Sequence, residues 1–302
     1  MRICSFFSSG TELLGALGLT RSIVGRSETC DFPPAMRRVP VVVRSRVRSS
    51  ALSSRGIHEA VDDLRRRGEP HYTIDLARLA RLRPDVVVTQ TLCNVCAASH
   101  PEVFEAVAGL PSKPRIVTVD ARRLDELLQS IQRMGDATQR RTQAAALIAR
   151  MRRRVDAIQR TLRGIRHRPG VWCAEWLDPL MAGGHWVPEI VELAGGCDLF
   201  GHPGRDSECF TWDDIRQRDP EVIAIMPCSF SLVRTVKESP RLTRLRGWSH
   251  VRAVQAGRVF AVNASLFHRP GPRLLDGLQL MASLCHPDRF PKPSAAYARR
   301  IA

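Results

Sequence analysis

Aromatic and neutral polar residues recur in the segments that follow the predicted strands of this sequence. The aromatic members of this set are Phe32, Trp176, Trp186, Phe230 and Phe267. The neutral members, which can form hydrogen bonds, are Ser8, Ser9, Gln90, Asn263 and Ser265. Broad apolar walls with a few neutral hydrogen-bonding groups are typical of a pocket for a large organic ligand. The pattern therefore predicts the binding of a large ligand that carries few charges.

Histidine and cysteine are the residues of this sequence that could hold a metal. His185 and His268 lie in two different predicted loops and could coordinate a metal ion, but we expect each to donate a hydrogen bond instead. Cys93 and Cys96 form the one CxxC pair of the sequence. Without a second pair this is a weak zinc signal, and two buried small side chains explain it equally well.

Charged residues also occur in the predicted loops. Glu175 and Asp178 flank Trp176, and each could bind backbone amides of its loop or contact a ligand. Arg46 and Arg269 are the two loop arginines that we place near the ligand. Trp186 could face the ligand or pack between domains. These alternatives stay open at the level of sequence.

The sequence contains none of the common catalytic fingerprints. It has no G-x-S-x-G, H-E-x-x-H, Walker or G-x-G-x-x-G motif, and its loop carboxylates have no basic partner at a motif spacing. We therefore predict a protein that is not an enzyme and needs no catalytic cofactor.

Composition narrows the class of protein and its partners. The 302 residues are 44% hydrophobic, and the net charge is +16. Lysine occurs only at positions 113, 237 and 292, and the many arginines are scattered along polar helix faces without interleaved aromatics, which argues against a nucleic-acid partner. We expect a monomer. The nine cysteines, an odd number, fit a reducing compartment. As written, the sequence starts without a secretory signal and predicts a cytoplasmic location; an export signal upstream of Met1 would place the protein in the periplasm.

The elements that must position these residues alternate between strands and helices along the chain. Steady alternation predicts an α/β fold with mostly parallel sheets, and such sheets bind ligands beyond the carboxyl ends of their strands. Residues 138–164 have one apolar stripe and predict a long unbroken helix. We expect two Rossmann-like lobes, at residues 1–137 and 167–302, joined by this helix within 138–166, with the ligand cleft between the lobes. The last dozen residues are predicted to form a loose tail.

Six segments of the sequence, in order, carry a resemblance to a known family. They are ICSFFSSGTELLGALGL, VGRSETCDFPP, LARLRPDVVVTQTLCNVCA, EWLDPLMAGGHWVPEIVELAGG, FTWDDIRQRDPEVI and GRVFAVN. Together they resemble the helical-backbone (class III) periplasmic substrate-binding proteins of ABC importers, which carry cobalamin and ferric siderophores. The resemblance covers residues 3 to about 290 and is nearest to the cobalamin-binding branch.

The resemblance implies a ligand, a partner and specific residues. It implies cobalamin, or another small-molecule corrinoid, as the bound ligand, and it places Arg269 next to that ligand. It implies an ABC permease that contacts one acidic residue on each lobe. Asp213, or secondarily Asp214, occupies this place in the second lobe; in the first lobe Cys96 does, with Glu102 the nearest acidic replacement.

Two alternatives to the corrinoid carrier remain. A ferric siderophore would require a cluster of arginines around the anionic complex. A cytoplasmic enzyme or metal-delivery protein of corrinoid or tetrapyrrole metabolism would use His185, His268, Cys93 and Cys96 as chelating groups.

Overall fold

The computed structural model describes residues 1–92 and 100–302. The chain divides into two compact units: residues 1–52 and 56–150 form the first, and residues 53–55 and 151–302 form the second. Each unit contains its own six-stranded sheet. The predicted α/β class with two mostly parallel sheets is confirmed.

The first unit is built on the strand order β4-β3-β2-β1-β5-β6. Its strands are β1 (Ile3–Ser5), β2 (Ile23–Ser27), β3 (Val41–Ser45), β4 (Tyr72–Ile74), β5 (Val86–Thr89) and β6 (Arg115–Thr118). All neighbouring strands are parallel except β3 and β4. β5 is buried at all of its positions, as expected for a valine-rich strand covered on both faces.

Six α-helices of the described chain lie between these strands or follow the last of them. They are α1 (Ser8–Ala16), α2 (Ser54–Arg66), α3 (Leu76–Leu82), α4 (His100–Ala108), α5 (Leu124–Ala137) and α6 (Arg141–Thr161). The division between the units falls within α2 and within α6, after Arg55 and after Arg150. None of the helices in residues 1–92 and 100–302 is long and apolar enough to cross a membrane.

The second unit is built on the strand order β12-β11-β10-β7-β8, with β9 paired to β7. Its strands are β7 (Gly170–Leu177), β8 (Leu180–Ala182), β9 (Cys197–Asp198), β10 (Val222–Ile225), β11 (Val259–Val262) and β12 (Ala298–Arg300). β7, β10 and β11 run parallel, and β8 and β12 are antiparallel strands at the two ends of this order. Their parallel carboxyl ends therefore share one edge of the sheet.

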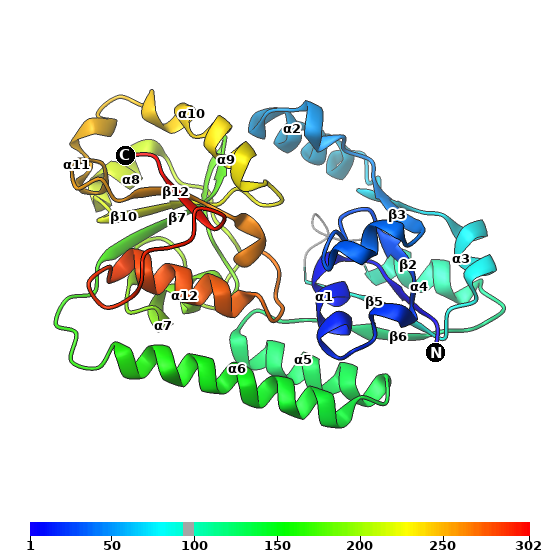
Figure 1. Ribbon diagram of the computed structural model, residues 1–302. Coiled ribbons are helices and arrows are strands. Elements are labelled where there is room, and N and C mark those ends of the chain that lie inside the picture. Colours follow the sequence, from blue (N-terminus) through cyan, green and yellow to red (C-terminus); the bar gives the residue numbers. More distant parts are fainter. Residues whose placement is uncertain (93–99) are drawn as a thin grey trace. The chain divides into compact units, whose positions relative to one another are not determined.

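Helices cover both faces of the second sheet. They are α7 (Val187–Leu193), α8 (Trp212–Arg218), α9 (Leu232–Glu238), α10 (Pro240–Thr243), α11 (Arg252–Gln255) and α12 (Leu274–Cys285). Figure 1 shows α7 and α12 on one face and α9, α10 and α11 on the other. Trp172 of β7 lies in the core of this unit with no exposed surface.

The long helix differs from its prediction at its first turn. α5 ends at Ala137 and α6 begins at Arg141. Residues 138–140, which were predicted to begin the long helix, therefore lie between the two helices. Gln139 has φ 58°, in the left-handed region, which stops a right-handed helix. A Cβ at Gly135 would lie 2.5 Å from the Cβ of Ala144, so glycine allows the two helices to approach closely at this corner. The apolar stripe of α6 is confirmed, because Leu147, Met151, Ile158 and Leu162 are buried.

The sequence analysis missed four strands: β4, β8, β9 and β12. β7 continues to Leu177 and turns back into β8, so Trp176 belongs to a strand and not to a loop. The predicted loose tail contains β12, which pairs with β11. Backbone bonds hold it at both ends: Asn263 N–H donates to Tyr297 O (2.8 Å) and Ile301 N–H to Val259 O (2.8 Å).

Asp198 at the end of β9 carries a carboxyl oxygen with an unusual environment. Its Oδ1 accepts the N–H groups of Phe200 (2.9 Å) and Gly201 (2.8 Å). Its Oδ2 is shielded from solvent and has no hydrogen-bond partner among the described residues. Burial raises the pKa of Asp198 to about 6, and the two backbone bonds oppose this shift. Asp198 therefore binds a proton more tightly in the folded protein than in the unfolded chain.

Replacing Asp198 with asparagine tests this assignment. Because the folded-state pKa lies above the unfolded value, this group stabilises the fold most at low pH, and that contribution is lost as the pH rises through about 6. From about pH 7.5 to about pH 4.5, the unfolding free energy of the wild type should gain about 2 kcal/mol relative to D198N. Urea unfolding of both proteins at the two pH values measures the difference. D156N, at an exposed position of α6, is the control; equal pH dependence of D198N and the wild type would contradict the assignment.

Candidate ligand-binding site

The carboxyl ends of β7, β10 and β11 bring three predicted binding segments of the second unit to one edge. Glu175 and Trp176 lie near the end of β7, Phe230 follows β10, and residues 263–269 follow β11. In open α/β sheets, this edge is where ligands bind.

Glu175 ties together two loops at this edge. Its Oε2 accepts a hydrogen bond from the backbone N–H of Gly184 (3.2 Å) and another from the hydroxyl of Ser207 (2.8 Å). Its Oε1 lies 3.9 Å from Nδ1 of His268, in the segment after β11. A charged acceptor makes stronger hydrogen bonds than a neutral one. Of the two roles considered for this side chain, binding of backbone amides is the one that the structure shows.

His268 uses its other ring nitrogen to bind the end of the neighbouring strand. Its Nε2 lies 2.6 Å from the backbone oxygen of Met226. A carbonyl only accepts, so Nε2 carries the hydrogen and donates. The second nitrogen, Nδ1, faces the Glu175 carboxylate. The hydrogen-bonding role predicted for His268 fits this geometry, and Nε2 is occupied.

His185 has a different partner. Its Nε2 lies 3.0 Å from Oδ1 of Asp206, and its ring centroid lies 5.6 Å from that of Trp186. In residues 1–92 and 100–302, no three His, Cys, Asp or Glu side chains are grouped so that they could hold a metal ion. Cys93 and Cys96, the weak zinc candidates, lie outside these residues.

The four aromatic candidates that the sequence analysis selected in the second unit form two pairs. Trp176 meets Phe230 edge-on, with ring centroids 5.4 Å apart, and the indole N–H of Trp176 donates to Ser54 O (3.2 Å). Trp186 donates its indole N–H to Phe267 O (2.5 Å). Phe230, Trp186 and Phe267 are buried, and Trp176 is half-buried. Three of the four rings thus pack the loops of this edge, and Trp176 is the one with substantial exposed surface.

The remaining polar candidates of this edge lie in the segment after β11. Asn263 caps the short helix 264–266 by accepting the backbone N–H of Ser265 at 3.2 Å. Arg269, like Asn263 and Ser265, is half-buried. The predicted role of these residues in binding a ligand stays a prediction.

In the first unit, the predicted binding residues also lie at the carboxyl ends of strands. Ser8 follows β1 and donates its hydroxyl to Thr29 O (2.7 Å), while Ser9 is buried in α1. Gln90 follows β5 and is buried; Phe32, in contrast, is 41% exposed. Arg46 follows β3 and forms an ion pair with Glu69. Its guanidinium also donates to Pro70 O (3.3 Å).

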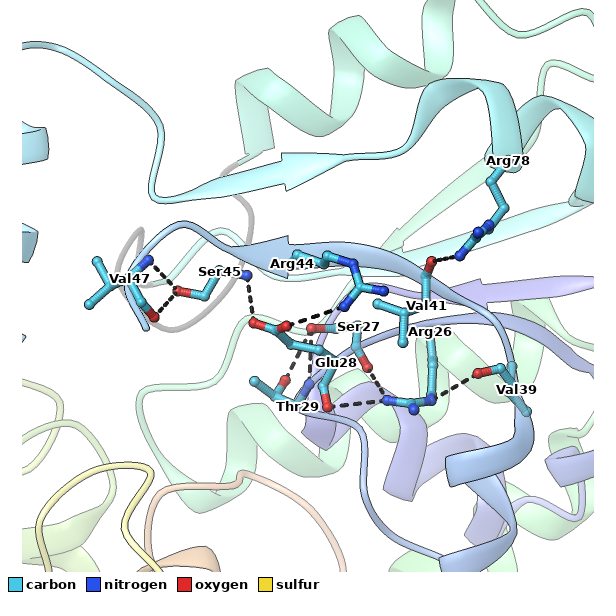
Figure 2. A network of polar contacts seen from close by, with 10 residues as sticks. All are labelled: Arg26, Ser27, Glu28, Thr29, Val39, Val41, Arg44, Ser45, Val47 and Arg78. Carbon is cyan, nitrogen blue, oxygen red and sulfur yellow. Dashed lines mark hydrogen bonds and ion pairs between the residues drawn. The ribbon is translucent and has the colours of Figure 1, made fainter. Parts of the chain in front are cut away.

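A second carboxylate, Glu28, fixes the loops of the first unit (Figure 2). Its Oε1 accepts the backbone N–H of Ser45 (2.7 Å), and its Oε2 lies 3.8 Å from the guanidinium of Arg44. Arg26 donates to Ser27 O (2.9 Å) and to Val39 O (3.1 Å). The end of β2 is thereby attached to the end of β3. The sequence analysis missed this network, although an acid directly after a strand is a signal that could have indicated it.

The two acids considered for permease docking on α8 have separate environments. Asp214 accepts the N–H and the hydroxyl of Thr211 in a capping box, and these bonds lower the pKa of Asp214. Asp213 is 83% exposed and forms an ion pair with Arg216 (3.1 Å). The geometry therefore favours Asp213 over Asp214. Glu102, the acid considered in the first unit, lies in α4.

A pocket of about 530 Å³ opens beside the turn between β7 and β8. It is lined by Leu177, Asp178, Leu180, Arg241, Leu242, Arg244 and Leu245. Asp178 lies 3.4 Å from Arg241 and 3.9 Å from Arg55. Asp178 therefore holds side chains of its own unit, and no hydrogen bond from a backbone N–H to Asp178 is seen among the described residues.

Comparison with known proteins identifies relatives over nearly the whole chain. A family described as periplasmic binding protein matches residues 3–266. An ABC transporter substrate-binding lipoprotein of Bacillus subtilis, YvrC, is 22% identical over 96% of this chain and 81% of its own. A vitamin B12-binding protein of Vibrio cholerae is 23% identical over 92% of this chain and 86% of its own. The crystal structure of a periplasmic heme-binding protein from Pseudomonas aeruginosa superposes with a TM-score of 0.69 at 22% identity, covering 100% of this chain and 98% of the other.

Removal of the Glu175 carboxylate tests its role in holding the loops. In Glu175→Ala the N–H of Gly184 and the hydroxyl of Ser207 lose a charged acceptor, so we expect a loss of about 2–4 kcal/mol in unfolding free energy. Asp178→Ala, three residues away, removes exposed ion pairs and should cost less than about 1 kcal/mol. Urea unfolding monitored by tryptophan fluorescence compares the two variants. Equal losses would contradict the role assigned to Glu175.

Proposed function

Because the chain belongs to the periplasmic binding protein family, we propose that it captures a corrinoid of the cobalamin type and delivers it to an ABC permease. The family assignment makes it a non-catalytic substrate-binding protein of the ABC-transporter type, with a small-molecule ligand and a permease as partners. The identity of the ligand and the residues that bind it are our proposal.

The observation that carries the proposal is the half-buried Trp176 at the carboxyl end of β7, supported edge-on by Phe230. A fixed aromatic ring at a strand-end edge offers a flat apolar surface to a corrin macrocycle. In both units, neutral residues that can form hydrogen bonds lie at the carboxyl ends of the strands. Arg46, a charged residue at such an end in the first unit, is already paired with Glu69. A ligand with many amide groups and few charges suits such surroundings. The relative described as a vitamin B12-binding protein agrees with this choice.

A metallated tetrapyrrole such as haem is the second candidate. It shares the flat apolar body of a corrinoid, and a solved structure of the same fold is described as a heme-binding protein. A ferric siderophore has less support, because Arg44 and Arg46 at the end of β3 are already paired with Glu28 and Glu69. The metal-delivery alternative also has less support, since Nε2 of His268 is bound to Met226.

We further propose the place of action and the contact with the permease. Relatives of this chain are periplasmic or lipoprotein binding proteins, which favours a location outside the cytoplasm over the cytoplasmic one expected from the sequence as written. Asp213 of the second unit and Glu102 of the first are the proposed contacts with the permease. A ligand site formed by the strand-end loops of both units, and a monomeric state, stay predictions.

Titration of the purified chain with cyanocobalamin tests the proposed ligand. We expect heat of binding in calorimetry, quenching of tryptophan fluorescence and a rise in melting temperature. Trp176→Ala should weaken binding about 10- to 100-fold, because it removes the half-buried ring on which the ligand is proposed to lie. Trp212→Ala, which removes a half-buried tryptophan on α8, is the matched control and should bind like the wild type.

Parallel titrations with haemin and with a ferric siderophore rank the alternatives. Tighter binding of either ligand than of cyanocobalamin would replace the corrinoid in this proposal. The absence of heat and of a thermal shift at ligand concentrations of about 100 μM would contradict it altogether.

A further inference from the structure

The second unit exposes a group of arginines along α6 and the turn that follows it. Residues 151–166 contain six arginines and one acid, Asp156. Four of these arginines form what we call the α6 arginine face: Arg152, Arg153, Arg160 and Arg163. All four are exposed, and their guanidinium groups have no hydrogen-bond or ion-pair partner in residues 1–92 and 100–302. The positive charge of this face is therefore directed to solvent.

The spacing of these arginines places them opposite the buried side of the helix. Successive residues of an α-helix are about 100° apart around its axis, so Arg152, Arg153 and Arg160 lie within an arc of about 100°. Met151 and Ile158 lie on the other side of the helix and are buried. Figure 1 shows this half of α6 alongside α7 and α12. The helix thus packs through one side and presents cations on the other.

Arginines that face the body of the second unit have partners. Nη2 of Arg154 lies 2.8 Å from Oδ1 of Asp276 in α12 and donates to Leu275 O (3.2 Å). Arg168 donates to Glu192 O (2.7 Å). Contacts within the unit therefore explain Arg154 and Arg168, and they do not explain the charge of the α6 arginine face.

We infer that the α6 arginine face docks on an anionic phospholipid surface. Guanidinium groups bind phosphate oxygens through paired hydrogen bonds, and clustered cations on one helix face are attracted to anionic bilayers. Residues 151–166 contain no aromatic residue, whereas sites for single-stranded nucleic acid use aromatic rings for stacking. The apolar side of α6 is buried in the protein, so the contact is with lipid headgroups and is electrostatic.

Such a contact suits a carrier whose partner is embedded in a membrane. The inference goes beyond the proposed function and does not depend on which ligand is bound. An ABC permease is the partner implied by the family, and the relative YvrC is described as a lipoprotein. Confinement of a carrier to the bilayer surface raises its effective concentration at the permease. Because the contact is electrostatic, salt should weaken it.

Co-sedimentation of the full chain with lipid vesicles tests the inference. One set of vesicles contains phosphatidylcholine with about one third phosphatidylglycerol, and the other contains phosphatidylcholine alone. The test variant replaces the α6 arginine face: R152Q/R153Q/R160Q/R163Q. The matched control removes the same charge from four other exposed arginines of the second unit: R205Q/R244Q/R246Q/R299Q. Glutamine keeps the helix propensity of arginine, and circular dichroism with the melting temperature establishes that each variant folds.

We expect the wild type to bind the anionic vesicles, and raising NaCl from about 50 mM to about 300 mM should release it. The test variant should bind them at least about tenfold more weakly, because each arginine near an anionic surface adds to the attraction. The control variant should change by less than about threefold. R152Q/R153Q alone, away from the end of α6, should show an intermediate loss and serves if the quadruple variant does not fold.

Three results would overturn the inference. The first is equal binding of the wild type to both sets of vesicles, or no binding to either. The second is an equal loss in the test and control variants, which would assign the effect to net charge instead of to this face. The third is displacement of the wild type from the vesicles by a random DNA duplex at equal phosphate concentration, which would make nucleic acid the occupant. None of these results bears on the cyanocobalamin titration, so the proposed function is tested separately.

Discussion

Backbone N–H groups at and just beyond the ends of strands need hydrogen-bond acceptors, and at three places in this protein carboxylates supply them. Glu28 accepts the N–H of Ser45, and Glu175 accepts that of Gly184. Asp120 does the same for Thr91, at 2.7 Å. A hydrogen bond to a charged acceptor is stronger than one to a neutral acceptor, so each carboxylate holds two segments of the chain together. The loops at these strand ends are fixed in part by these contacts.

The aromatic residues in the loops of the second unit differ in how far they are buried. Trp186, whose role was left open between ligand contact and packing, is buried and donates its indole N–H to the backbone oxygen of Phe267, which is also buried. This bond holds the segment before α7 against the segment after β11, whereas Trp176 is half-buried. A site whose loops are ordered in advance loses less conformational entropy when it binds.

Local patterns in the sequence predicted much of this fold, but contacts between segments far apart in the sequence could not be predicted from such patterns. The valines of β5 and the apolar stripe of α6 each follow from the spacing of neighbouring residues, so both were recognised. β12 pairs with a strand more than thirty residues earlier, and no local pattern marks that pairing. Trp176 was placed in a loop because the hairpin of β7 and β8 depends on pairing with Met181. The resemblance to a known family added the ligand class and the partner, which the elements alone do not determine.

The same reasoning explains why polar side chains were harder to assign than apolar ones. Burial of a valine follows from its type, whereas the role of an acid depends on which donors the fold brings within about 3 Å of it. Asp213 and Asp214 are neighbours of identical type, yet one is 83% exposed and the other accepts two hydrogen bonds at the start of α8. Capping satisfies the helix terminus with one acid and leaves the second directed outward. Glu175 and Asp178 also differ in their contacts: Glu175 accepts a backbone N–H, and Asp178 forms ion pairs with arginines. Among the described contacts, the fold places a backbone N–H beside Asp214 and Glu175, whereas Asp213 and Asp178 are paired with arginine side chains.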